Sequence, residues 1–123
     1  MKPALLTVSV LLLASGVAVA QGPQPSKPQN EHEFLKKFAG EWTSKSKAVG
    51  SDAEYSGSIK SSMLGEFWVV NKMRGDMGGM KFDAIQTIGY DEKKKKYVGT
   101  WIDTMMNHRW HYEGSVDDSG TQL

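Results

Sequence analysis

The hydrophobic pattern of this chain changes period at Gly40, from the spacing of a helix to that of a strand. Before this glycine, apolar side chains recur on one helical face, at Phe34, Leu35 and Phe38. They predict an amphipathic helix over residues 31–39, with Asn30 as its N-cap and Glu33 completing a capping box. Gly40 stands where a left-handed residue would end such a helix. The apolar face of the helix needs a surface to cover.

After Gly40 the side chains alternate with period two, in six segments separated by turns rich in glycine and charged residues. The expected strands are 42–49, 55–63, 67–74, 82–90, 96–103 and 108–116. Residues 75–81 hold three glycines and are expected to form a flexible loop, and Thr121 is expected to open a seventh strand. Strands joined in sequence by short turns predict an all-β fold, an antiparallel up-and-down meander or barrel, with the short N-terminal helix covering one end.

Small residues occupy several positions that this alternation places on the inward side of the sheet. They are Ser44, Ser46, Gly57 and Gly99. Lysines alternate with the serines of the first strand and are expected to face outward. Small inward side chains leave space that a packed core would fill, which favours an interior with room for a ligand.

The N-terminus has the three regions of a secretory signal peptide. A basic start precedes an apolar stretch over residues 4–13, and the A-x-A sequence at 18–20 predicts cleavage between Ala20 and Gln21. The apolar stretch is shorter than the roughly 20 residues that a membrane-spanning helix needs. We therefore expect a signal peptide at residues 1–20 and a secreted or periplasmic protein that is free of the membrane after cleavage.

The rest of the sequence divides into two parts, a linker and one domain. Residues 21–29 contain three prolines and cannot bury a core, so they are predicted to be a disordered linker, and residues 30–123 form the domain. The chain has no cysteine, which excludes disulfides, thiolate metal sites and a lipid-attachment cysteine. With 15 basic and 14 acidic residues, the formal net charge of +1 gives no bulk attraction to nucleic acid, and no nucleic-acid partner is expected.

The order of the strands predicts where a ligand site would lie. The connections after Arg74 and Asp103 follow the third and fifth expected strands, so they emerge at one end of the meander, away from the helix. Side chains of this mouth and of the strand positions just below it are the candidate ligand-binding residues. They are Met77, Met80, Trp101, Asp103, Met105, Met106, His108 and Trp110. Methionine and aromatic side chains around a mouth predict a small apolar or amphipathic ligand.

The same residues allow other chemical roles. Asp103 and His108 flank one loop and could form an acid–base pair, although Asp103 as a turn cap and His108 as a rim residue fit the pattern better. Methionines near histidines suggest Cu(I), but the single M-x-x-M spacing lacks the repetition of dedicated copper-binding tracts. His108 is also the one reasonable axial ligand for haem. No nucleophile has a recognisable partner, so we predict no enzyme activity, no catalytic residue, no metal-ligating set and no cofactor.

Three blocks of the sequence resemble a bacterial family known as domain of unknown function 1579, and the resemblance runs from about residue 32 to the end of the chain. The blocks are residues 65–70, 77–80 and 89–103. The resemblance implies a lipocalin-like β-barrel and leaves the ligand open. The sequence Gly40-Glu41-Trp42 is similar to the G-x-W signature of lipocalins, whose tryptophan packs under the helix that closes the barrel. Gly40 and Trp42 are thus expected to have a structural role.

The resemblance also implies a longer domain. Members of this family continue for several more strands, so we expect the chain to be an N-terminal fragment, with an oligomer that completes the sheet through its open edge as the alternative. For function, a secreted binding module competes with a structural or protein-interaction domain whose core is packed solid. A periplasmic copper or haem binder is the third hypothesis.

Overall fold

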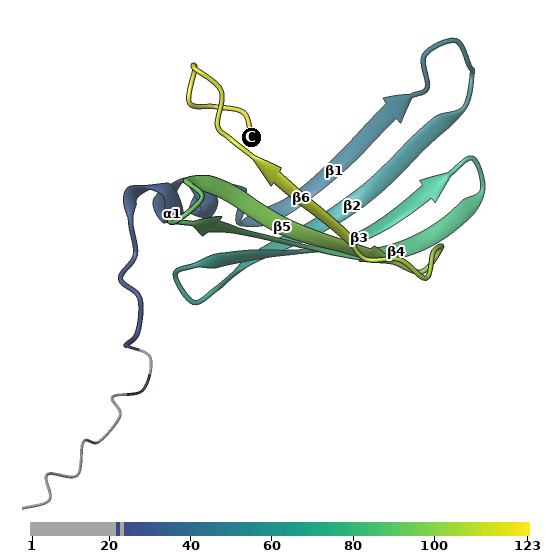
Figure 1. Ribbon diagram of the computed structural model, residues 1–123. Helices are drawn as coiled ribbons and strands as arrows, with labels where there is room; N and C mark the ends of the chain where they lie inside the picture. Colours follow the sequence, from purple (N-terminus) through teal and green to yellow (C-terminus); the bar gives the residue numbers. More distant parts are fainter. Residues whose placement is uncertain (1–21, 23) are drawn as a thin grey trace, which may run out of the picture.

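The computed structural model describes residues 22 and 24–123 of the 123-residue chain (Figure 1). The predicted signal peptide and the cleavage site between Ala20 and Gln21 lie outside the described residues. Residues 24–29, part of the predicted linker, are exposed and belong to no helix or strand. No helix within residues 22 and 24–123 is long and apolar enough to cross a membrane.

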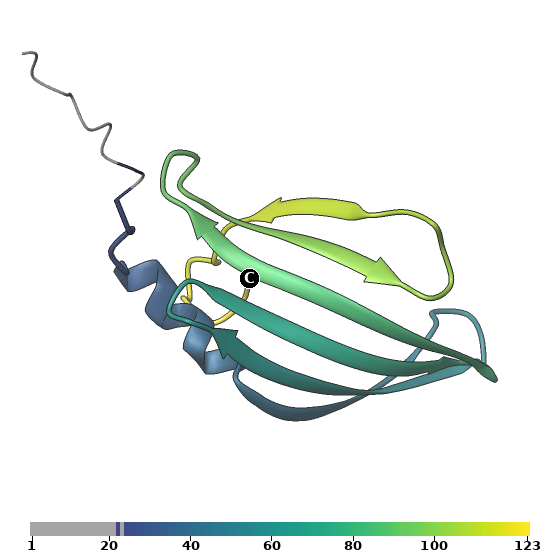
Figure 2. The same cartoon turned by 90° about the horizontal axis from the view of Figure 1, so that it is seen from below.

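Six antiparallel strands form one sheet, in which each strand pairs with its neighbours in sequence. The strands are β1 (Gly40–Lys47), β2 (Glu54–Leu64), β3 (Trp68–Met77), β4 (Met80–Asp91), β5 (Lys96–Asp103) and β6 (Trp110–Gly114). This order confirms the predicted meander (Figure 1). The sheet curls, but β1 and β6 do not pair with each other, so the described strands do not close the predicted barrel (Figures 1 and 2). A small barrel that encloses a ligand closes with about eight strands, more than this sheet has.

The connection between β3 and β4 is a tight hairpin turn, and the flexible loop predicted for residues 75–81 was wrong. Only Gly78 and Gly79 separate the two strands, and both have positive φ, 64° and 97°. Two such residues form a turn whose twist matches that of the flanking strands. The backbone N–H of Gly79 also donates to Asp76 Oδ1 at 2.6 Å. Glycine at these positions serves the geometry of the turn rather than mobility.

A short helix precedes the sheet and continues as a single 3₁₀ turn; the two segments are α1 (Asn30–Leu35) and η1 (Lys36–Phe38). The N-cap is Gln29, whose backbone N–H donates to His32 Nδ1 at 2.9 Å. The predicted N-cap Asn30 was therefore wrong by one residue. Glu33, the predicted capping partner, instead forms an ion pair with Lys36 at 2.6 Å.

The helix packs against one face of the sheet, which we call the inner face; the opposite face is the outer face. Leu35 and Val69 are fully buried between them and form a core cluster with Ile88 and Tyr97. Figure 2 shows α1 at the end of the sheet that carries the β2–β3 and β4–β5 turns. The apolar core is therefore concentrated at this end, where the helix covers the sheet.

Further contacts fix the helical segment on the sheet. Tyr97 donates its hydroxyl hydrogen to the carbonyl oxygen of Glu31 at 2.9 Å, which ties α1 to β5. Trp42 Nε1–H donates to the carbonyl oxygen of Phe38 at 2.8 Å, although the residue is 50% exposed. Phe34 and Phe38 pack against the core cluster, which confirms that this helix covers one end of the sheet.

Aromatic rings cover glycines of the neighbouring strand at three positions. The pairs are Phe82 with Gly75, Trp68 with Gly89, and Tyr112 with Gly99. A Cβ atom on Gly99 would lie 2.2 Å from the carbonyl oxygen of Thr87 and 2.6 Å from Cε2 of Tyr112. Gly99 was expected to leave interior space, and this was wrong because the Tyr112 ring fills it.

The predicted seventh strand from Thr121 does not form. Asp117 Oδ1 accepts hydrogen bonds from the backbone N–H groups of Thr121 and Gln122, at 3.1 Å each. The backbone N–H of Asp117 donates to the carbonyl oxygen of Gln122 at 2.8 Å. The segment therefore folds into a turn, because an aspartate side chain occupies backbone donors that a strand would use for pairing. Val116, just before it, packs against the core cluster.

Candidate ligand site on the inner face

The strand register divides the inner face into rows of residues that lie side by side across the sheet. The row nearest the helix consists of Met63, Val69, Ile88, Gly99 and Tyr112. The next row, which we call the polar row, consists of Ser61, Asn71, Gln86, Trp101 and Trp110. Beyond it come Trp42, Ile59, Met73, Ala84 and Asp103. The inner face thus changes from a helix-covered apolar region, through a polar row, to a more open apolar region.

A hollow of about 330 Å³ lies in this open region, and we call it the inner hollow. Its apolar walls are Tyr55, Ile59, Met73, Met77, Phe82 and Trp101. Ser44, Ser46 and Gly57 also line it, so three of the four small inward residues border open space. Its volume lies at the lower end of the range of small-molecule sites, about 300–1,000 Å³.

The two connections that were predicted to emerge at one end of the sheet do so. The β3–β4 turn and the connection between β5 and β6 emerge at one end of the sheet, opposite α1 (Figure 1). Of the eight candidate ligand residues, Met77 and Trp101 line the inner hollow. Met80 pairs with Met77 across the turn and is 56% exposed.

Met105 and Met106 lie outside the hollow, in the loop that follows β5, and both are exposed. The start of this loop is fixed beside β4, because the backbone N–H of Thr104 donates to the carbonyl oxygen of Asp83 at 3.0 Å. Met80 lies three residues beyond Asp83, roughly 10 Å farther along an extended strand. The long β3–β4 hairpin therefore separates the two groups of methionines that the sequence suggested would gather.

Asp103 caps the loop after β5. Its Oδ2 accepts the indole N–H of Trp101 at 2.7 Å, and its Oδ1 accepts the backbone N–H groups of Met105 and Met106 at 2.8 and 3.0 Å. The Trp101 hydrogen bond, followed by that of Met105, lowers the pKa of the Asp103 carboxyl below its usual value. The carboxylate thereby orients the Trp101 ring at the edge of the hollow, and the turn-cap interpretation fits this geometry.

We expect the Trp101–Asp103 contact to survive mild acid. Because the pKa of Asp103 is lowered by folding, its contribution to stability is present above the unfolded-state pKa and is lost as the pH falls through the folded-state pKa. The indole N–H resonance of Trp101, followed by NMR, should therefore hold its position until the pH falls below the usual aspartate value of 3.8. In Asp103→Asn the acid-induced step should vanish. A step at or above that value in the unmodified protein would contradict the assignment.

His108 and Trp110 lie on the far side of the same loop. Their rings meet edge to face with centroids 4.3 Å apart, and Trp110 is 46% exposed. Trp110 begins β6 and pairs with Trp101, whereas His108 precedes the strand that was expected to include it. Among the described residues, no group of three or more histidine, aspartate or glutamate side chains could hold a metal ion.

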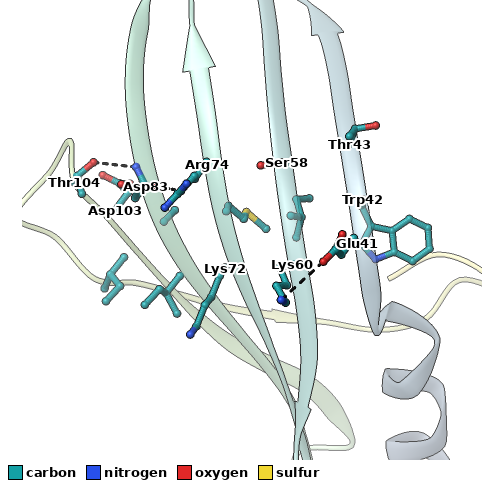
Figure 3. A pocket seen from close by; sticks show the side chains of 15 residues that line it. Glu41, Trp42, Thr43, Ser58, Lys60, Lys72, Arg74, Asp83, Asp103 and Thr104 are labelled. Carbon is teal, nitrogen blue, oxygen red and sulfur yellow. Dashed lines mark hydrogen bonds and ion pairs between the residues drawn. The ribbon is translucent and has the colours of Figure 1, made fainter.

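A second, larger concavity of about 850 Å³ lies on the outer face, and we call it the outer trough. Figure 3 shows charged side chains across it: Lys60 pairs with Glu41 at 3.8 Å, and Arg74 pairs with Asp83 at 3.3 Å. All four side chains are at least 68% exposed, so these ion pairs are solvated. Ile85 and Ile102, cross-strand neighbours on β4 and β5, also line the trough and are partly exposed.

Residues 27–123 match the family described as a protein of unknown function, DUF1579. The chain belongs to the DUF1579 family. No curated protein and no solved structure matches the chain. The family assignment agrees with the resemblance seen in the sequence, and the six-stranded meander is the architecture of this DUF1579 chain.

Several residues of the inner face of this DUF1579 sheet were not predicted from the sequence. Asn71 and Gln86 place amide groups in the polar row, between apolar neighbours on the same strands. Ile59, Met73 and Phe82 supply walls of the hollow. Both amides could have been found from the sequence. The alternation of side chains along β3 and β4 places them at inward positions, where apolar residues are expected.

Proposed function

We propose that this DUF1579 domain is an exported binding module that holds a small apolar or amphipathic molecule in the inner hollow. The supporting observation is the composition of the hollow: six apolar or aromatic side chains line it together with the small residues Ser44, Ser46 and Gly57. Sites for small molecules are concave and mainly apolar, with a few polar groups that fix orientation. Asn71 and Gln86, in the polar row beside the hollow, supply such groups.

The inner hollow suits an apolar ligand better than the outer trough does, despite its smaller volume. The outer trough carries two solvated ion pairs, and an apolar ligand there would remain next to water and charge. The inner hollow has six apolar or aromatic walls, so a bound apolar group exchanges water for apolar contacts. Burial of apolar surface is the main favourable term for such a ligand.

The test is a fluorescence titration with Nile red, an apolar dye, on the domain and two variants. Trp101→Ala removes an aromatic wall of the hollow and should weaken dye binding by about tenfold. Lys94→Ala, in the β4–β5 turn, removes an exposed ion pair with Glu113 and should leave dye binding unchanged. Circular dichroism confirms that both variants fold. Equal effects of the two substitutions, or no dye uptake by the unmodified domain, would refute the proposal.

A protein-interaction domain is the second candidate, favoured by the two free edges of the sheet. All eight residues of β1 are exposed, and neither β1 nor β6 has a second neighbouring strand within the described residues. Such edges can pair with a strand of another chain, although lysines on β1 oppose this. Sedimentation over a range of concentrations tests the candidate: association that persists at low micromolar concentration supports it, and a monomer throughout argues against self-association.

A further inference from the structure

One buried polar atom on the inner face has no hydrogen-bond partner. Asn71 is 5% exposed, and its Oδ1 is the single buried side-chain nitrogen or oxygen left unpaired within the described part of the chain. Its Nδ2 donates to Gln86 Oε1 at 2.7 Å. A buried acceptor without a donor is destabilising, so such atoms in folded proteins commonly mark a place for a water or a ligand.

The direction of the neighbouring hydrogen bonds fixes which Asn71 atom remains free. The Tyr112 hydroxyl donates to the carbonyl oxygen of Thr100 at 3.2 Å, and a carbonyl can only accept. Burial raises the pKa of Tyr112, and the Gln86 side chain opposes this by lowering it. The Gln86 side-chain carbonyl oxygen accepts a hydrogen bond from Asn71 Nδ2 and is therefore turned toward Asn71. Asn71 must meet it with its NH₂ group, which leaves Oδ1 as an open acceptor.

This open acceptor lies next to the inner hollow. Met73, the next inward residue along β3, lines the hollow, and Met73 pairs across the sheet with Ile59, another wall. Trp101, a third wall, pairs with Gln86 in the polar row. A methionine side chain is unbranched and adapts its shape readily, so Met73 can move to admit a ligand toward Asn71.

We infer that the inner site selects a ligand whose buried end is a neutral hydrogen-bond donor, such as an alcohol or an amide N–H. The inference rests on the proposed function and adds to it the chemistry of the ligand's polar end. A carboxylate or an ether has no hydrogen to donate to Asn71 Oδ1, and a carboxylate also carries a charge that is costly to bury without a partner. An ammonium group can donate, but the polar row contains no acidic side chain to pair with it.

The test compares three ligands with the same ten-carbon chain: 1-decanol, decyl methyl ether and decanoate, each displacing Nile red. The unmodified domain should bind 1-decanol about five- to tenfold more tightly than the ether, because one hydrogen bond contributes about that factor to affinity. It should bind decanoate more weakly than the alcohol. Equal affinity for alcohol and ether overturns the inference, because a water then satisfies Asn71, yet leaves the proposed function intact. Failure of all three ligands and of the dye overturns both.

Two variants assign the preference to Asn71. Asn71→Leu keeps the side-chain size and removes the acceptor, so the alcohol-to-ether ratio should fall to about one. Gln86→Leu frees the Asn71 amide to rotate and should lower the same ratio. Met106→Leu, in the loop outside the hollow, should keep the ratio of the unmodified protein. An unchanged ratio in both Asn71→Leu and Gln86→Leu would overturn the assignment, and the comparison in the unmodified protein decides the inference even if a variant does not fold.

Discussion

Gly99→Ala should destabilise the domain by about 3 kcal/mol, because β5 has no space for a side chain at this position. The added Cβ would lie 2.2 Å from a backbone atom, the carbonyl oxygen of Thr87, and 2.6 Å from the Tyr112 ring. The sheet would have to separate, since a backbone oxygen in the neighbouring strand cannot move aside as a side chain can. Urea denaturation followed by circular dichroism measures the loss.

Gly89→Ala is the matched control for this prediction. Its Cβ would meet only the Trp68 ring among near contacts, at 2.4 Å, and Trp68 is 41% exposed on the outer face. The indole can swing toward solvent, so the expected cost is about 1 kcal/mol. Equal losses of stability in Gly99→Ala and Gly89→Ala would contradict the prediction, because Gly99 would then tolerate a side chain as well as Gly89 does.

Leu35→Ala should remove about 3 kcal/mol of stability and detach the helix from the sheet. Leu35 is the one fully buried side chain of α1 in the described structure, and it fills the centre of the cluster with Val69, Ile88 and Tyr97. Its truncation leaves a cavity in the contact between the helix and the inner face. Denaturation gives the free energy, and limited proteolysis within residues 24–39 reports release of the helix.

Lys37→Ala provides the control on the same helical segment, because Lys37 is exposed and its Nζ lies 5.0 Å from the centroid of the Phe34 ring. This variant should remain as resistant to proteolysis as the unmodified domain. If Leu35→Ala also kept its resistance and its midpoint in urea, the helix would not depend on Leu35 for its position.

The strands could be predicted from the sequence because side-chain alternation follows directly from backbone geometry. The alternation of β2 was predicted correctly, because Gly57, expected to face inward, lies on the inner face with Ile59 and Met63. Closure of the sheet could not be predicted, since it depends on whether the first and last strands meet, and local alternation carries no information on that. The prediction for the turn at Gly78 and Gly79 was wrong for another reason. Glycine permits both a mobile loop and a tight hairpin, and the sequence pattern does not distinguish the two.

The site could be predicted only in part. Met77 and Trp101 line the inner hollow because strand order alone places them near its open end. Met105 and Met106 do not line the hollow. The relative lengths of β3, β4 and β5 determine how far each connection lies from the centre of the sheet, and these lengths could not be predicted from the sequence. Asn71 and Gln86 belong to no recognisable sequence motif. Their hydrogen bond becomes evident only from the strand register, which places them side by side.

Methyl NMR with ¹³C-labelled methionine and isoleucine side chains tests the central claim most directly, because each concavity has methyl groups that the other lacks. Met77 lines the inner hollow alone, Ile85 and Ile102 line the outer trough alone, and Ile59 and Met73 border both. On titration with 1-decanol, we expect the methyl resonances of Ile59, Met73 and Met77 to shift together and saturate, while those of Ile85 and Ile102 stay in place. Shifts confined to Ile85 and Ile102, or no shift at any methyl group, would contradict a ligand site on the inner face.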